Sequence, residues 1–139
     1  MPCYRGGVRT CLLNLAGRKL SVRDEEELRG HLASVREGRP AEVWLEDSAN
    51  GTLLLLSNGR EAFLMHLPDQ HGDHPGWTTR APEAENLKET VSGFVLSNGQ
   101  VDEFPSSWVV PLQKGVDAFV HFYRHGERAP WLTWHDDST

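Results

Sequence analysis

Cysteine is scarce in this chain of 139 residues, where only Cys3 and Cys11 occur, both close to the N-terminus. They form no Cys-x-x-Cys pair, and a chain of this length buries enough surface to fold without covalent staples. We therefore expect reduced thiols in a cytosolic protein, although the spacing leaves a disulfide between Cys3 and Cys11 open.

Long apolar runs are missing as well. The longest, Leu53–Leu56, is far shorter than the ~18 residues that a membrane-spanning helix needs. Arg5 and Arg9 near the N-terminus are not followed by an apolar stretch long enough for a secretory signal. These absences predict a protein that has no membrane span and is located in the cytoplasm.

Basic residues are in the minority. The chain has 14 Lys and Arg against 20 Asp and Glu, which gives a formal net charge of −6 at pH 7. Nucleic-acid-binding proteins normally carry a basic stripe, whereas the basic residues here are scattered. Direct binding to DNA or RNA is therefore not expected. The acidity either keeps the protein soluble or faces a basic partner, and both interpretations stay open.

The motifs of common enzymes do not occur either. There is no nucleophile elbow, no phosphate-binding loop and no dinucleotide fingerprint. Two histidine pairs have the spacing of metal ligands, His71 with His74 and His121 with His125. Neither pair has further ligands at a suitable spacing, and the second lacks the general-base glutamate of a metalloprotease helix. We expect no enzyme, no cofactor and no bound metal.

Hydrophobic periodicity predicts the secondary structure. Strands are expected over residues 10–15, 41–47, 52–57, 61–67, 90–96, 100–104 and 131–134. A first helix is expected over 22–37, because Ser21 and Asp24 form a capping-box pattern before an apolar stripe. A second helix begins at Val110-Pro111 and ends at Gly126. Its apolar stripe consists of Val116, Phe119, Val120 and Tyr123.

These elements define the fold class. Asn58-Gly59 and Asn98-Gly99 are typical of hairpin turns, so neighbouring strands should pair antiparallel. The sequence predicts a single α+β domain over residues 1–139, an antiparallel β-sheet built from hairpins with two α-helices packed on one face. The other face should be less covered, with Trp44 on that side.

The C-terminal third carries a resemblance to a known family. Its ordered motifs are Phe104-Pro105, Trp108–Pro111, an apolar helix over Val116–Tyr123, then Gly126, Pro130 and Trp131–Trp134. This set resembles immunity protein family 1 of bacterial polymorphic toxin systems. In that family a strand leads through a Val-Pro step into a helix. After a glycine and a proline, a short strand then ends in tryptophan.

The resemblance implies a function. The chain would be a cytoplasmic antitoxin that binds a cognate toxin in a 1:1 complex and occludes it without turnover. Toxins encoded beside this family are often nucleic-acid deaminases, with cytosine as the expected target base. Such a toxin would present a basic nucleic-acid-binding cleft, and an acidic inhibitor would be attracted to it at a high association rate.

The partner-binding surface is predicted from the residues, because the resemblance transfers no contact set. The irregular stretch Pro68–Pro82 is long for a compact domain, and such loops are often functional. Two glutamates beside the hairpin turns add charge. The candidate contact residues are Glu61, Asp69, His71, Asp73, His74, Trp77 and Glu103.

Two alternatives remain. One is a protein-interaction adaptor without a toxin partner, which gene neighbourhood would separate from an immunity protein. The other is a metal-dependent hydrolase that uses His71, His74, His121 and His125. The hydrolase predicts a bound metal in the purified protein.

Overall fold

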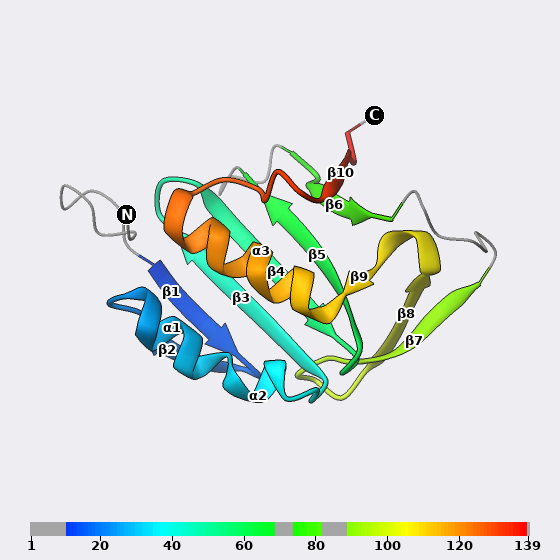
Figure 1. Ribbon diagram of the computed structural model, residues 1–139, viewed down its shortest axis with the longest axis horizontal. Coiled ribbons are helices and arrows are strands. Elements are labelled where there is room, and N and C mark those ends of the chain that lie inside the picture. The colour runs from blue at the N-terminus through cyan, green and yellow to red at the C-terminus, as the bar shows by residue number, and fades with distance from the viewer. Residues whose placement is uncertain (1–10, 69–73, 82–88, 139) are drawn as a thin grey trace.

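A computed structural model describes residues 11–68, 74–81 and 89–138 (Figure 1). Its largest feature is an antiparallel sheet with the strand order β10-β6-β5-β4-β3-β1-β2, and β9 pairs with β5. Together with the helices, this sheet confirms the predicted α+β class. The strands of the sheet are β1 Cys11–Leu15, β2 Arg18–Ser21, β3 Ala41–Asp47, β4 Gly51–Ser57, β5 Glu61–Leu67, β6 Trp77–Arg80, β9 Val110–Pro111 and β10 Thr133–Asp136.

The central hairpin β4–β5 forms at the predicted turn. β3 and β5 have the predicted bounds, and β4 begins one residue early. The Asn58 Oδ1 atom accepts hydrogen bonds from the backbone N–H groups of Arg60 and Glu61, at 2.9 and 2.8 Å. Gly59 has a φ of 98°, and a Cβ there would collide with the carbonyl oxygen of Gly38. The Asn-Gly signal is therefore confirmed, and the glycine also allows two turns to touch.

The first predicted helix is divided and begins later than predicted. α1 spans Glu25–His31 and α2 spans Ala33–Arg36. The N-cap residue is Asp24, whose carboxylate accepts a hydrogen bond from the Glu27 N–H at 2.8 Å. Ser21, the predicted cap, belongs to β2.

The reason for this shift is a hairpin that the sequence analysis did not resolve. Ala16 and Gly17 have φ angles of 53° and 85° and turn the chain back on itself. As a result β1 pairs with β2, with Leu12 opposite Ser21. A turn with two positive φ angles suits the twist of a two-residue hairpin.

The second predicted helix is present as α3, Leu112–His125, which lies across the sheet (Figure 1). Its predicted start is wrong, because Val110-Pro111 pair with β5 as β9 and the helix begins after them. Gly126 ends it in the left-handed conformation, with a φ of 71°. The close approach of the helix to the sheet depends on Gly115, because a Cβ at this position would lie 2.7 Å from the Cβ of Ala62. The predicted apolar stripe is buried, and its members are Val116, Phe119, Val120 and Tyr123.

The two faces of the sheet are covered by different elements. Leu53 and Leu55 of β4 belong to the core beneath the helices, whereas Leu54 and Leu56 belong to a second apolar cluster on the opposite face. That cluster includes Trp44, in agreement with the prediction. It is covered by a hairpin of β7 Thr90–Val95 and β8 Val101–Pro105, followed by the short helix η2 Ser106–Trp108.

This hairpin corrects the predicted arrangement. The predicted fold has every hairpin in a single sheet with one face less covered. β7 and β8 instead form a separate two-stranded sheet that packs on that face. The physical reason is aromatic packing: the ring of Phe104 stacks on Phe63 of β5 at 4.3 Å and meets Phe94 edge-on at 5.1 Å.

Two further differences concern the edge of the sheet. β6 lies within the stretch predicted to be irregular, and it pairs with β5 and β10. β10 begins at Thr133, two residues after the predicted start at Trp131. A four-residue strand between prolines and glycines gives little periodicity, and its main partner is supplied by the far end of the chain.

Cys11 is disulfide-bonded, so the expectation of a reduced thiol at this position is wrong. Cys3 lies outside the described residues. None of the helices within the described ranges combines the length and the apolar character that crossing a membrane requires.

Candidate functional site

The predicted contact residues that the structure describes do not form one cluster. Of the seven, four lie within the described part of the chain. Glu61 accepts a hydrogen bond from the Asn58 side-chain amide at 3.1 Å, so its carboxylate is part of the β4–β5 turn. Glu103 is exposed on β8. His74 and Trp77 are brought together, whereas Asp69, His71 and Asp73 lie outside the described residues.

His74 and Trp77 stack at the β6–β10 edge of the sheet. Their rings are parallel, with centroids 5.6 Å apart. The His74 Nδ1 atom accepts a hydrogen bond from the Gly76 N–H at 2.8 Å, and its Nε2 lies 2.9 Å from the Asp136 carboxylate. Since Nδ1 accepts, the proton of the neutral ring is on Nε2 and is donated to Asp136.

Arg128 and His66 complete this edge, and neither was singled out from the sequence. The guanidinium carbon of Arg128 lies 4.1 Å from the ring centroid of Trp77, a cation–π distance. One Arg128 nitrogen lies 2.9 Å from the Nδ1 atom of the buried His66. Arg128 follows the end of α3 in an irregular segment, where periodicity carries no information, so no signal in the sequence could have paired it with His66.

Burial lowers the pKa of His66 below its usual range. The hydrogen bond to the Asn50 carbonyl opposes this change, and the positive charge of Arg128 adds to it. A neutral imidazole held between a carbonyl and a guanidinium is a structural arrangement, because both ring nitrogens already have partners. The edge of the sheet is therefore a closed polar network rather than an open site.

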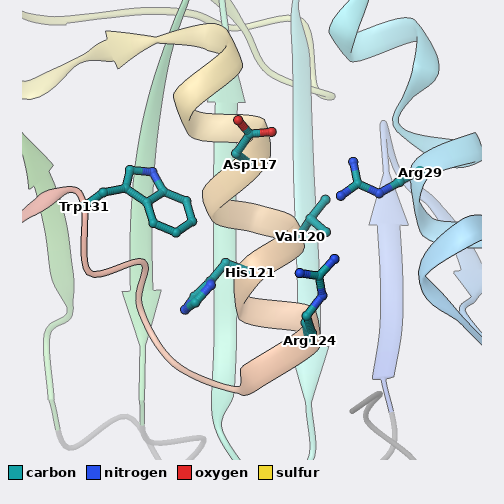
Figure 2. A pocket seen from close by; sticks show the side chains of 6 residues that line it. All are labelled: Arg29, Asp117, Val120, His121, Arg124 and Trp131. Atoms are coloured by element: carbon teal, nitrogen blue, oxygen red, sulfur yellow. The ribbon is translucent and has the colours of Figure 1, made fainter.

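A surface hollow lies over α3, beside α1 and the segment before β10 (Figure 2). Its volume is about 300 Å³. Trp131 and His121 point to one side of α3, and Arg29 and Arg124 lie on the other side. The lining residues are Arg29, Asp117, Val120, His121, Arg124 and Trp131.

The charged side chains around this hollow form hydrogen bonds and ion pairs with neighbouring side chains. The Glu25 carboxylate accepts hydrogen bonds from Arg124 at 2.8 and 2.7 Å and from Arg29 at 2.9 Å. The bonds from Arg124 have the largest effect and lower the pKa of Glu25, although burial opposes them. Asp117 accepts a hydrogen bond from Gln113 at 2.9 Å. Ion pairs within α1 and between α1 and α3 thus border the hollow.

Trp131 forms the apolar wall of the hollow. It is 49% exposed. The ring of His121 meets it edge-on at 5.0 Å, and the Nε2 atom of His121 lies 2.8 Å from the Glu127 carboxylate. The hollow can accept one side chain of a partner between an indole face and paired charges, but it holds no nucleophile beside a base.

His71 of the hydrolase hypothesis lies outside the described residues, and His74 and His121 have separate partners. His74 is paired with Asp136 and His121 with Glu127, while the rings of His121 and His125 lie 4.5 Å apart. Within residues 11–68, 74–81 and 89–138, no three His, Cys, Asp or Glu side chains gather into a metal-ligand group. Neither protein-family models nor curated proteins gave a match to this chain.

Proposed function

We propose that this chain is an immunity protein that binds a cognate toxin in a 1:1 complex and blocks it by occlusion. The observation that carries the proposal is the order of structural elements in the C-terminal part of the chain. β9 leads directly into α3, and Gly126 ends the helix. Trp134 of β10 then returns its indole N–H to the Ala129 carbonyl at 3.0 Å. Strand, Val-Pro step, helix, glycine, proline and strand follow one another in the order that the resemblance implies.

The charge of the chain supports a basic partner. A toxin that acts on nucleic acid must hold a phosphate backbone, so its active-site cleft is basic. A protein with a net charge of −6 is attracted to such a cleft before contact, which raises the association rate more than the final affinity. On this proposal the target is a nucleic-acid deaminase and the mode of action is stoichiometric binding.

The proposed compartment is the cytoplasm of the producing cell, where the toxin would otherwise act. The disulfide at Cys11 counts against this part of the proposal, because reducing cytoplasm disfavours disulfides. Counting free thiols in protein quenched with alkylating agent inside the producing cell decides the point. A fully alkylated protein would support the cytoplasm, and an unreactive Cys11 would exclude it.

Co-expression tests the function itself. The product of the reading frame directly upstream is expressed with and without this chain, and the two proteins are passed together over size exclusion. We expect a stable complex and growth arrest only when this chain is omitted. In a titration of the purified toxin, activity should fall linearly and end at an equimolar ratio. An unrelated toxin is the control, and a harmless upstream product that does not bind would refute the proposal.

A further inference from the structure

Exposed large apolar side chains are few among the described residues, and two of them are neighbours. Among the described residues, only Val95, Val101 and Trp131 are large apolar side chains with high exposure. Val95 is 41% exposed and Val101 is 61% exposed. These two valines are direct register partners across the β7–β8 hairpin. They therefore form one apolar patch on the outer face of a two-stranded sheet.

The hairpin presents this face rigidly. Phe94 and Phe104 on its inner face are packed against the sheet, which fixes the alternate residues outward. At the turn, the backbone N–H and the hydroxyl of Ser97 both donate to the Glu42 carboxylate, at 3.0 and 2.9 Å. Burial acts to raise the pKa of Glu42, but the hydrogen bond from Trp44 and the two from Ser97 together outweigh it and lower this pKa. The outer face thus needs little ordering when a partner binds.

The charge of the hairpin has one sign. The stretch 90–105, from the start of β7 to the end of β8, contains Asp102 and Glu103 and has no Lys, Arg or His. Glu103 is two positions from Val101 and is also exposed, so the two side chains share the outer face. An apolar pair beside the Glu103 carboxylate is complementary to a surface that is basic and also offers apolar contact.

From these observations we infer that the outer face of the β7–β8 hairpin, defined by Val95, Val101 and Glu103, is the docking surface for a basic protein. The inference rests on the proposed function for the identity of that protein, a toxin with a cleft built for a phosphate backbone. The valines supply the desolvated centre of the contact. The Glu103 carboxylate takes the place that a phosphate occupies in the toxin's substrate complex.

The hollow at Trp131 is the competing surface. Its two guanidiniums are bonded to Glu25 and Asp117 also lines it, so its charges offset one another and give no net attraction for a basic partner. Its apolar wall is a single indole, in edge contact with His121. Charge complementarity therefore favours the hairpin over the hollow for a basic partner.

The test uses the full chain and the purified product of the upstream reading frame, with affinity and association rate measured by surface plasmon resonance. Val101→Lys and Glu103→Lys should each weaken binding about tenfold or more, as expected at the centre of an interface. Val101→Thr keeps the β-branched shape and should have a smaller effect. Glu103→Gln should mainly slow association and flatten its dependence on salt. Trp131→Ala is the matched control and should bind like the wild type.

Each outcome is decisive. Loss of binding in the two lysine variants with retention in Trp131→Ala supports the hairpin, provided that the variants keep the wild-type thermal unfolding profile. Wild-type binding by both lysine variants overturns this inference and leaves the proposed function standing. The same holds if only Trp131→Ala loses affinity, which would move the interface to the hollow. If the upstream product does not bind the wild type, the proposed function fails, and this inference fails with it.

Discussion

The guanidinium of Arg128 donates a hydrogen bond to the Nδ1 atom of His66 over 2.9 Å, although 62 positions separate the two residues. An arginine nitrogen cannot accept, so Nδ1 must be the unprotonated nitrogen of the ring. The ring proton is then on Nε2, which donates to the Asn50 carbonyl at 2.9 Å. Both ring nitrogens of the neutral imidazole are thus hydrogen-bonded. The stability of the fold therefore depends on the charge state of His66.

The first prediction follows from the lowered pKa of His66, whose usual value is 6.5. As pH falls through 6.5, the unfolded chain binds a proton at His66 before the folded protein does. Neutral His66 therefore contributes its full stabilisation of the fold above pH 6.5. This contribution is lost as pH falls toward the lowered pKa. Protonation of this residue should lower the free energy of unfolding by at most about 1.4 kcal/mol per pH unit. Urea unfolding between about pH 8 and pH 5 measures it.

A variant isolates this contribution from the other histidines. His66→Asn keeps an oxygen near the position of Nδ1 and cannot titrate. The variant should be less stable at every pH, because the edge contact with Phe122 at 5.1 Å is lost. Its stability should nevertheless decline less steeply below pH 6.5, the usual pKa of the ring. Parallel curves for the variant and the wild type would show that His66 does not carry the pH dependence.

The second prediction concerns Arg128. Arg128→Met removes the donor to His66 and the cation above Trp77, and it should destabilise the protein by about 1–3 kcal/mol. The pKa of His66 should rise, because the charge of Arg128 contributes to lowering it, although burial still holds it below the usual value. A proton NMR titration of the imidazole measures the pKa. The exposed Arg60→Met is the control and should leave both quantities unchanged.

The third prediction compares two helical glycines. Alanine normally stabilises an exposed helix relative to glycine, so Gly30→Ala in α1, with nothing within 4 Å of the new Cβ, should gain ~0.5–1 kcal/mol. Gly115→Ala in α3 should lose about 1–3 kcal/mol, because the methyl group would meet the Ala62 Cβ and force the helix away from the sheet. Thermal unfolding of both variants gives the comparison. A gain at both positions would mean that α3 can shift freely on β5.

The sequence predicts those parts of the fold that local patterns specify. Alternation located β3 and β5, Asn58-Gly59 located the turn, and Gly126 located the end of α3. Prediction from the sequence failed where the structure depends on contacts with residues distant in the chain. Local patterns predicted β7 and β8 as strands, but not that they pack on the far face of the sheet instead of joining it.

The candidate sites show the same limit. Trp77 is a candidate because it falls in the stretch predicted to be irregular, yet it lies in a strand, in contact with His74 and Arg128. Glu103 was chosen for its position beside a turn, and the structure places it next to two exposed valines whose pairing no local pattern revealed. The charge and exposure of a single residue can be predicted from the sequence. Which residues share its surface depends on the register of the paired strands.

The last prediction separates the two C-terminal tryptophans. Trp134 packs against the core beneath the helices and donates to the Ala129 carbonyl at 3.0 Å. Trp134→Ala should therefore cost about 2–4 kcal/mol of stability. Trp131→Ala should change stability by only about 0.5–1 kcal/mol, because half of its surface is exposed and its main contact is one histidine edge. Urea unfolding of both variants measures the difference. An equal loss would assign the Trp131 indole to the core and would remove its use as a surface control for the hairpin.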